Sequence, residues 1–372
     1  MRKGFLATAI LMLISTLPAT AAELPEIQLR IQSIDTPTAQ VRGSNGERGA
    51  AIARLADGRL LLGGGSTGLT LFLYDLTNQK QTTIGRAGTS AERLNDSRFA
   101  ITDIAVLTET ADTAQLLISY PRYNSARECV TVVVHSYQAN FGPQPSLKRG
   151  KLWFQSNPCV PVSAVQHAAG RMEVIDAKSA YLTIGDLGYP EIGNKAKRGT
   201  LGSVMQISAN KITQISSGHR NAQGILLIGK DLYTSEHGPR GGDELNLIQQ
   251  GIDYGWPTVT YGEKYSFGDY VKPTNPESHN GFRKPLAYWV PSVAPTELIQ
   301  LPAASTWGQW SSSIVMGKLR EESLIFIQMK NKRVVGQMQT VNVNERIRDL
   351  DLSKDGSIIA TTDSGKLLVI TL

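Results

Sequence analysis

The segment TSEHGPRGGDELNLIQQGIDYGWPTVTYG, residues 234–262, contains the residue types of an oxygen-lined metal site. Glycine relaxes the backbone and proline fixes its own φ angle, so Gly238 and Pro239 can turn their carbonyl oxygens away from a regular strand. Asp243 and Glu244 add carboxylates, and Ca²⁺ prefers hard oxygen ligands of both kinds. An acidic, solvated loop with a sharp turn explains the same composition, so both interpretations are open on these residues alone.

Two other polar segments contain groups suited to proton transfer and to polarising a bond. His167 precedes a predicted strand, and a histidine whose pKa is near neutrality can take a proton from a substrate hydroxyl. The sequence GHRNAQG, residues 218–224, predicts a tight turn that presents Arg220 and Asn221. The alternatives are that His167 is a structural histidine and that Asn221 caps the turn with its own side chain.

A fourth segment, ERIRDLDLSKDG, places Arg346 and Arg348 two residues apart. On a strand, this spacing puts both guanidinium groups on one face. Two like charges side by side are unfavourable unless an anion lies between them, so the pair indicates an anion site. The alternative is a strand face exposed to solvent.

The elements that must position these groups are predicted to be β-strands. Short apolar runs bounded by Gly, Asp, Asn and Pro occur throughout the 372 residues, whereas long helical periods are scarce. A turn–strand–turn–strand theme recurs six times. The copies are 56–76 and 354–372, which open on Asp-Gly turns, and four looser ones that begin at Asp112, Ala177, Gly229 and Glu321.

Repeats that cannot bury their own faces favour radial stacking in a β-propeller, although a jelly roll or a two-sheet sandwich fits the same pattern. The wide gap between the copies at Gly229 and Glu321 predicts an inserted loop region.

Charge, the first residues and cysteine content constrain the compartment. The net charge is +6 without a long basic run, so the sequence does not indicate nucleic-acid binding. A short basic start and an apolar run over residues 5–17 predict a signal peptide, residues 1–22, and a protein that is exported and does not span a membrane. Cys129 and Cys159 are the only cysteines. In an oxidising compartment they can pair, or they can be two buried thiols.

In this order along the chain, the segments QHAAGRM (166–172), GHRNAQG and SEHGPRGGDELNLI followed by GIDYGWP resemble the glucose/sorbosone dehydrogenase family. The resemblance is strongest over residues 166–262 and returns at 345–356. It implies an all-β fold, a six-bladed β-propeller of four-stranded antiparallel sheets over residues 23–372. It also implies two cofactors, pyrroloquinoline quinone (PQQ) and Ca²⁺.

The resemblance further implies roles for the catalytic residues. His167 is the base that takes the proton of the sugar C1 hydroxyl while hydride passes to the quinone. Asp186, in IGDLG, supports that histidine. Arg220 polarises the quinone oxygen on which negative charge develops.

Further positions correspond to binding residues of the family. Arg220 and Asn221 match cofactor contacts, and Arg346 and Arg348 match the pair that meets the carboxylates of the quinone. Gly238 and Pro239 match the carbonyls that hold the cofactor's calcium, a Lewis acid.

Glu244 and Tyr254 match a second, structural calcium site.

Three positions depart from the family pattern. Arg98 falls where the family has a glutamine near the substrate. Arg320, or less well Lys318, aligns with a cofactor-binding lysine, and an arginine is not equivalent to a lysine at a tight anion site. Ser292 aligns with a cofactor-binding threonine and keeps the hydroxyl. These changes concern the substrate pocket more than the calcium sites.

The sequence thus predicts a periplasmic or secreted PQQ- and calcium-dependent aldose dehydrogenase that oxidises the C1 hydroxyl of a small-molecule aldose to a lactone. The electron acceptor is not specified by any residue. One alternative is a calcium-stabilised propeller that binds a ligand or partner without redox activity. A calcium-dependent lactonase is less favoured, because it would need several convergent carboxylates at the central metal.

Overall fold

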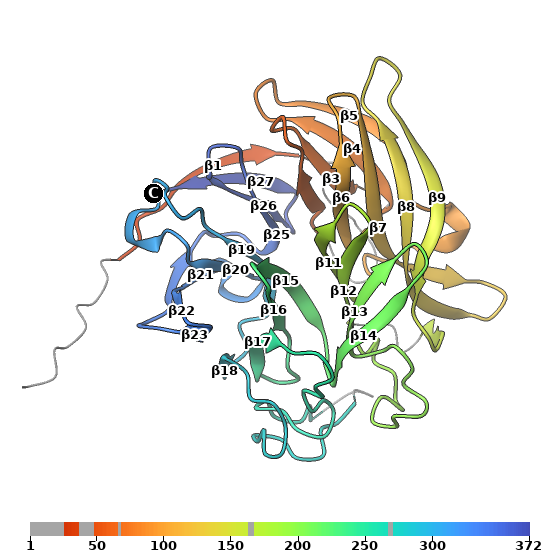
Figure 1. The fold of residues 1–372 in the computed structure, drawn as a ribbon, viewed down its shortest axis with the longest axis vertical. Coiled ribbons are helices and arrows are strands. Elements are labelled where there is room, and N and C mark those ends of the chain that lie inside the picture. Colours follow the sequence, from red (N-terminus) through yellow and green to blue (C-terminus); the bar gives the residue numbers. More distant parts are fainter. Residues whose placement is uncertain (1–25, 37–47, 66–67, 163–166, 267–270) are drawn as a thin grey trace, which may run out of the picture.

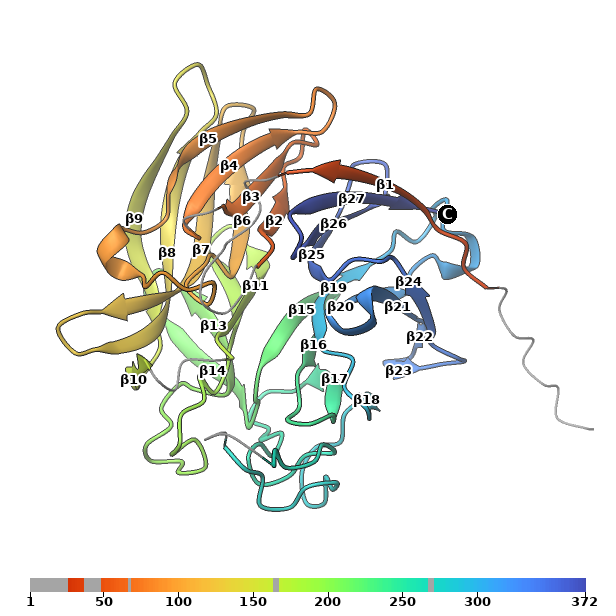
Figure 2. The same ribbon diagram turned by 180° about the vertical axis from the view of Figure 1, so that it is seen from behind.

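The computed structural model describes residues 26–36, 48–65, 68–162, 167–266 and 271–372. Six antiparallel sheets are arranged around a central axis, as Figures 1 and 2 show from opposite sides. The predicted six-bladed β-propeller is therefore confirmed. The predicted signal peptide lies outside the described residues.

The first strand of each blade lines the axis, and the following strands pair outward in order. Blade 1 contains β2 (Ala51–Arg54), β3 (Leu60–Gly64), β4 (Thr70–Asp75) and β5 (Lys80–Arg86). Blade 2 contains β6 (Asp103–Glu109), β7 (Thr113–Asn124), β8 (Cys129–Asn140), β9 (Ser146–Gln155) and β10 (Val160–Pro161). Blade 3 contains β11 (Ala169–Asp176), β12 (Ser179–Ile184), β13 (Ser203–Ser208) and β14 (Ile212–Ser217).

The second half of the ring repeats this order. Blade 4 contains β15 (Ala222–Ile228), β16 (Asp231–Glu236), β17 (Asp243–Ile248) and β18 (Ala287–Trp289). Blade 5 contains β19 (Pro295–Gln300), β20 (Ile314–Lys318), β21 (Ser323–Ile327) and β24 (Gln339–Asn342), with the hairpin β22 (Met329–Lys330) and β23 (Arg333–Val334) beside it. Blade 6 contains β25 (Ile347–Leu352), β26 (Ile358–Thr362), β27 (Lys366–Thr371) and, outermost, β1 (Arg30–Asp35).

Two features depart from a plain array of four-stranded blades. In blade 2, β8 pairs with both β9 and β10 on its outer side, so this sheet has five strands. In blade 6, β1 pairs antiparallel with β27 and completes the sheet from the other end of the chain. That pairing closes the ring.

The six sequence repeats fall one in each blade. The two copies with Asp-Gly turns form β3–β4 and β26–β27, and Gly58 and Gly356 have the positive φ angles of 98° and 85° that such turns require. The predicted insertion lies between β17 and β18, where residues 249–286 form turns and isolated bridges in the part that the structure describes.

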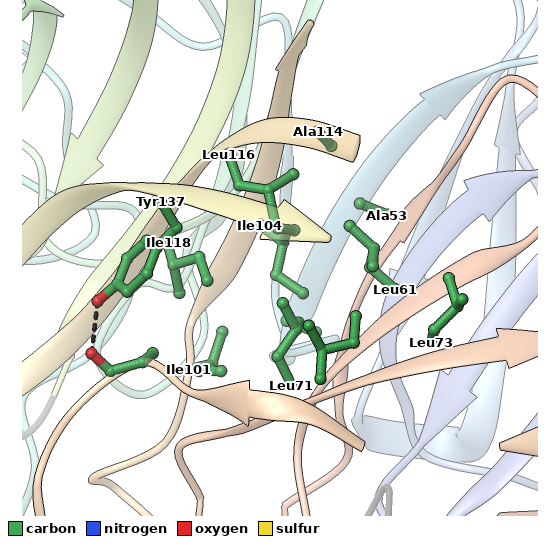
Figure 3. Close-up of a cluster of buried hydrophobic side chains, with 14 of the residues drawn as sticks. Ala53, Leu61, Leu71, Leu73, Ile101, Ile104, Ala114, Leu116, Ile118 and Tyr137 are labelled. Atoms are coloured by element: carbon green, nitrogen blue, oxygen red, sulfur yellow. Dashed lines mark hydrogen bonds between the residues drawn. The ribbon is translucent and has the colours of Figure 1, made fainter. Parts of the chain in front are cut away.

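The hydrophobic core lies between adjacent blades. Figure 3 shows one such interface, where Leu61 and Leu71 of blade 1 face Ile104 and Ile118 of blade 2. All four side chains are buried. Successive apolar residues along these strands point to opposite faces of the sheet, so each blade buries one set of side chains against each of its two neighbours.

Two predictions about the compartment can be compared with the structure. Cys129 and Cys159 form a disulfide, with Cα atoms 5.5 Å apart, that ties β8 to the segment before β10. Among the described residues, no helix is long and apolar enough to cross a membrane.

Candidate active site

A cavity of about 260 Å³ lies where the inner strands begin. We call it the cationic cavity. Since β2, β6, β11, β15 and β25 all start at the same end of the central channel, residues at or just before their first positions converge there. Its lining consists of Arg48, Arg98, Thr102, His167, Ala168, Ala169, Asn221, Gln223, His237, Leu319 and Arg348.

His167 is held between an acid and a guanidinium. Its Nδ1 lies 2.8 Å from Asp186 Oδ1 and its Nε2 lies 3.1 Å from Arg220 Nη2. Because a guanidinium can only donate, Nε2 must accept, and the proton of the neutral ring is therefore on Nδ1 and donated to Asp186. Nε2 thus carries the lone pair that a general base needs.

Local backbone geometry fixes this histidine. His167 has a φ angle of 50°, and a Cβ added at Gly185 would collide with the His167 carbonyl oxygen. Glycine at position 185, in the IGDLG segment, is therefore required for Asp186 to reach the imidazole.

The electrostatics keep the imidazole neutral and the carboxylate ionised. Burial, and next the positive charge of Arg220, lower the pKa of His167 below its usual value. Burial opposes ionisation of Asp186, but His167, Arg220 and the Gly188 amide outweigh it and hold the Asp186 pKa below its usual range. The other carboxylate oxygen, Oδ2, accepts a hydrogen bond of 2.9 Å from Trp256 Nε1.

Arg220 connects the histidine to the loop that contains the predicted metal ligands. Its Nη1 donates to the Gly238 carbonyl oxygen at 2.5 Å, and its guanidinium carbon lies 5.4 Å from the centre of the Trp256 ring. The side chain is buried. The structure thus brings the predicted catalytic residues His167, Asp186 and Arg220 into one contiguous group.

Asn221 lines the same cavity. Its Oδ1 accepts from the Ala169 amide at 3.2 Å and from Gln223 Nε2 at 2.9 Å. The side chain therefore bridges β11 and β15 rather than capping its own turn.

The arginine pair has an internal anion. Arg348 donates to both oxygens of Asp363 at 2.8 Å, and Arg346 Nε reaches the same carboxylate at 3.1 Å. Arg348 is buried and lines the cavity, whereas the Arg346 side chain is half exposed. The anion predicted between the two arginines is at least in part Asp363, 15 residues beyond Arg348 across the β25–β26 turn.

Three predicted residues lie at a second cavity of about 420 Å³, which we call the side cavity. Pro239, Ser292 and Arg320 line it. The Ser292 hydroxyl donates to Asp243 Oδ2 at 2.7 Å, so it supports the loop. The alternative cofactor residue, Lys318, is buried and paired with Glu321 at 2.7 Å. Since Leu319 lines the cationic cavity and Arg320 the side cavity, the two cavities are neighbours.

The loop carbonyls have the chemistry of calcium ligands. The Gly238 oxygen accepts from Arg220, and the Pro239 oxygen accepts from the Tyr265 hydroxyl at 3.2 Å. Each carbonyl oxygen has a second lone pair. Asp243 does not offer a ligand, because its oxygens accept from the Gly238, Val293 and Ala294 amides. The donor set fits a cation that takes its other ligands from a bound cofactor and water.

The second predicted metal site has a different composition. Glu244 Oε1 lies 3.0 Å from His279 Nε2, and Oε2 accepts from Asn246 at 3.0 Å. The Tyr254 hydroxyl donates to the Leu247 carbonyl at 2.5 Å. An imidazole therefore lies beside Glu244, and the calcium role of Glu244 and Tyr254 stays a prediction. Within the described residues, no group of three or more histidine, cysteine or acidic side chains could hold a metal.

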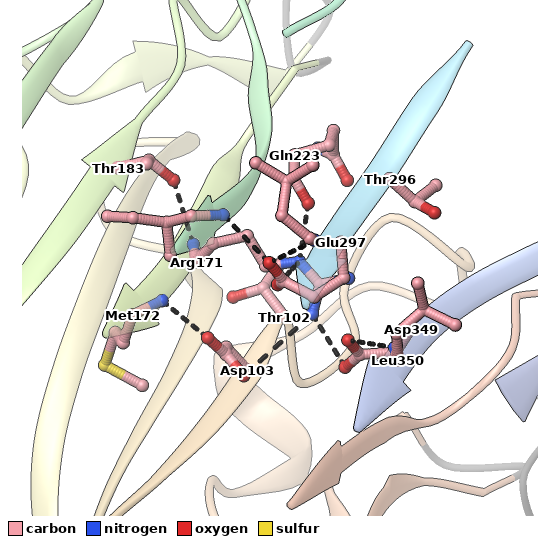
Figure 4. A network of polar contacts seen from close by, with 12 residues as sticks. Thr102, Asp103, Arg171, Met172, Thr183, Gln223, Thr296, Glu297, Asp349 and Leu350 are labelled. Atoms are coloured by element: carbon pink, nitrogen blue, oxygen red, sulfur yellow. Dashed lines mark hydrogen bonds and ion pairs between the residues drawn. The ribbon is translucent and has the colours of Figure 1, made fainter. Parts of the chain in front are cut away.

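A buried polar network, drawn in Figure 4, shares Thr102 and Gln223 with the lining of the cationic cavity. Arg171 donates to Asp349 Oδ2 at 2.7 Å and to the carbonyl oxygens of Gln223 and Arg348. Glu297 lies 3.4 Å and Asp103 3.9 Å from the same guanidinium. These contacts join five blades across the axis.

Sequence reasoning missed Arg48 and His237, which both line the cavity. His237 Nε2 donates to the Pro295 carbonyl at 2.7 Å, and burial, opposed by Asp243, lowers its pKa to about 4. The signal for His237 was its place beside Gly238. Nothing in the local sequence pointed to Arg48.

One protein family and several known proteins are similar to this chain. A sequence model of the Glucose / Sorbosone dehydrogenase family matches residues 47–369. Aldose sugar dehydrogenase YliI of Escherichia coli (strain K12) is 34% identical over 162 residues, which are 42% of this chain and 43% of that protein. Quinoprotein glucose dehydrogenase B of Acinetobacter calcoaceticus is 30% identical over 150 residues, or 30% and 31% of the two chains. An uncharacterized Synechocystis protein, slr1608, is 28% identical over 233 residues, 55% of each chain.

This chain therefore spans about half or less of the length of these relatives. Solved structures show the same fold over a larger share. The apo form of soluble aldose sugar dehydrogenase from Escherichia coli matches with a TM-score of 0.76 and 20% identity, over 92% of this chain and 99% of that one. The PQQ-bound aldose sugar dehydrogenase from Streptomyces coelicolor matches with a TM-score of 0.66 and 20% identity, over 94% and 100%. On the family match over most of its length, the chain belongs to the glucose/sorbosone dehydrogenase family.

Proposed function

We propose that the protein is an exported, PQQ- and calcium-dependent dehydrogenase that oxidises the C1 hydroxyl of an aldose to the lactone. One observation carries the proposal. A neutral histidine that lines a cationic cavity, with its Nδ1 held by a buried carboxylate and its Nε2 accepting from Arg220, is the arrangement of a general base beside an anion-binding pocket.

The chain's own residues account for the proton. His167 Nε2 takes the proton of the C1 hydroxyl, and Asp186 stabilises the imidazolium that results. Trp256 and the Gly188 amide hold Asp186 in place, and Asp186 in turn fixes the orientation of the imidazole. A bound quinone would supply the acceptor for the hydride of C1, and loss of the proton and the hydride leaves a carbonyl at that carbon.

Other residues hold the cofactor. Arg348 and Asn221 line the cationic cavity, whose excess of guanidinium groups fits an anionic ligand with several carboxylates. Gly238 and Pro239 would hold the calcium ion through their carbonyl oxygens. Arg220, already in contact with the base and with Gly238, supplies a fixed positive charge where negative charge develops.

The proposed compartment is the periplasm or the exterior of the cell. The predicted signal peptide, residues 1–22, supports it, as does the Cys129–Cys159 disulfide, because disulfides persist in oxidising compartments.

The test uses purified protein with Ca²⁺ and PQQ, and follows reduction of an artificial dye with a panel of aldoses. His167→Ala should lower the rate by about 10²–10⁴-fold while quinone binding, measured by absorbance, is kept. His135→Gln, a buried histidine of blade 2 outside the cavity, is the matched control. A His167→Ala protein that turns over aldoses at the wild-type rate would remove the base and with it the mechanism.

A second candidate function is ligand binding without redox turnover. Arg98 stands where the resemblance implies a glutamine near the substrate, and its guanidinium is paired with Asp96 at 2.8 Å. A protein that binds quinone and calcium but reduces no dye with any aldose would support this function over the dehydrogenase.

A further inference from the structure

Arg48 lies beside Arg348 at the wall of the cationic cavity. Its neighbour Gly49 packs directly on blade 6, where its amide donates to Asp363 Oδ1 at 3.0 Å. A Cβ at position 49 would collide with the Thr362 carbonyl and with Arg348 Cβ. This close packing fixes where the chain enters blade 1, and it directs Arg48 into the same cavity as Arg348.

The positive charge of Arg48 is not compensated in the way that its neighbours are. Arg348 has both oxygens of Asp363, and Arg98 has Asp96. Arg48 Nε is buried and makes no hydrogen bond. Within the described residues, no carboxylate lines the cavity. A buried donor without an acceptor is costly, and the cost is larger for a charged group.

The surroundings of Arg48 favour an added anion. Burial, and next the charges of Arg348 and Arg171, lower its pKa to about 9. The nearby carboxylates Asp363 and Asp349 act against this shift, but both already accept from other arginines. A negatively charged ligand in the cavity would supply the missing acceptor and reduce the repulsion between the guanidinium groups.

We propose that Arg48 binds a carboxylate of the anionic quinone cofactor, as a second cavity-lining guanidinium beside Arg348. This inference rests on the proposed function. A neutral aldose has no charge that could offset two adjacent guanidiniums, whereas a ligand with several carboxylates can meet both at once. Arg48 is thus a cofactor-binding residue that the local sequence did not indicate.

The experiment compares quinone binding by the full-length exported protein and by single variants. Protein fluorescence or quinone absorbance gives Kd in the presence of Ca²⁺ for wild type, Arg48→Gln, Arg48→Lys and a control, Arg59→Gln. Arg59 belongs to the same blade but pairs with Asp57 outside the cavity. Arg48→Gln should weaken binding by about tenfold or more, the effect of losing one charge-assisted hydrogen bond. Arg48→Lys should recover part of the affinity, and the control should match wild type.

A second readout separates binding from a structural role. Without cofactor, Arg48→Gln should unfold at the wild-type temperature or above it, because a partly buried cation whose Nε has no acceptor has been removed. The added stability that the quinone confers should at the same time be smaller than in wild type. If the variant without cofactor unfolds at a distinctly lower temperature, the guanidinium supports the fold and the inference is wrong.

The remaining outcomes also decide the question. Equal quinone affinity in wild type and Arg48→Gln would overturn the inference and leave the proposed function standing. Wild-type protein that does not bind the quinone would overturn both. Unchanged quinone binding with a raised KM for a uronic acid, but not for the matching neutral aldose, would assign Arg48 to a substrate carboxylate instead.

Discussion

The two ends of the central channel are built from the same inner strands and carry opposite charge. At one end, Arg48, Arg98 and Arg348 line the cationic cavity. At the other end lies a cavity of about 300 Å³, which we call the acidic cavity. Its charged lining residues, among those described, are Asp103, Glu173, Glu297, Asp349 and Asp351.

The pKa values of the charged groups are shifted in opposite directions at the two ends of the channel. Burial and the adjoining arginines lower the pKa of Arg48, whereas burial raises the pKa of Glu173 to about 8 and that of Asp351 to about 6. Like charges gathered in a poorly solvated channel favour the neutral form unless a counterion arrives. At the acidic end, bound protons can neutralise the carboxylates. An arginine does not readily lose its proton, so the positive charge at the cationic end is compensated by a bound anion instead. The difference therefore supports the cationic end as the place of the proposed cofactor.

The largest expected effect is the loss of stability that follows removal of Arg171. Arg171→Met leaves Asp349, Glu297 and Asp103 without their shared cation, and breaking a buried ion pair costs about 3–5 kcal/mol. Denaturant unfolding of the protein without cofactor measures the loss. Lys197→Gln, which removes an exposed pair with Glu191, should leave the unfolding midpoint close to that of wild type. Equal midpoints for wild type and Arg171→Met would show that the polar network around Arg171 does not stabilise the fold.

At the cationic end, Asp186→Asn should lower the turnover rate by about 10–100-fold, because the amide no longer favours the Nδ1–H form of His167 or stabilises its protonated form. Steady-state rates over a pH series measure this effect, and the pH dependence of the rate should move to lower pH, because Asp186 raises the pKa of His167 and its loss lowers that pKa further. Trp256→Phe keeps the ring beside Arg220 but removes the hydrogen bond to Asp186, so its effect should be smaller. An Asp186→Asn profile that coincides with wild type would contradict the role of the acid.

At the acidic end, stability should rise as the pH falls from about 8.5 to 6.5. The folded pKa values of Asp103, about 7, and Glu173, about 8, exceed their unfolded values of about 4. The stability linked to these protons is present at low pH and is lost as the pH rises through about 7–8. Below about 6.5 the buried histidines His135 and His237, with pKa values of about 4, oppose the gain.

Thermal unfolding across that pH range checks this prediction. Glu173→Gln should reduce the change in stability between about pH 8.5 and 6.5 by about 1 kcal/mol or more, since each unit of pKa shift corresponds to about 1.4 kcal/mol. Asp363→Asn is the contrasting variant, because the pKa of Asp363 is lowered to about 2 and its contribution is constant over the same range. A slope that Glu173→Gln leaves intact would place the titration elsewhere.

The smallest expected effect is stabilisation by a simple polyanion. Citrate at constant ionic strength should stabilise the wild-type protein by about 0.4 kcal/mol when its concentration equals its Kd. Arg48→Gln should respond less. If citrate and chloride stabilise both proteins equally, the cationic cavity does not bind a polyanion specifically.

Much of the fold could be predicted from short-range patterns. The Asp-Gly turns at Gly58 and Gly356 require positive φ angles, and they mark hairpins wherever an apolar run follows. The gap before Glu321 correctly indicated the insertion in blade 4. The extra strand β10 was not predictable, because it consists of two residues and pairs with β8 next to the Cys129–Cys159 disulfide.

The site was predictable where its residues share a loop and not where they meet across the axis. His167, Arg220 and Gly238 lie in recognisable segments, and the structure joins them. Arg171 and Asp349 are 178 residues apart, so no local pattern relates them. The role proposed for Arg48 depends on its position beside Arg348, which belongs to blade 6 and becomes a neighbour of blade 1 when the ring closes. The metal roles of Gly238, Pro239, Glu244 and Tyr254 remain predictions.

The outermost strand of blade 6 has a consequence for solubility. Most side chains of β1 are exposed, so the strand contributes little to the hydrophobic core, yet its backbone covers the whole length of the largely apolar β27. If residues 30–35 were deleted or detached, β27 would present a row of unpaired amides and carbonyls along LLVI. Such an edge recruits strands from other molecules, so self-association is expected before any loss of the core.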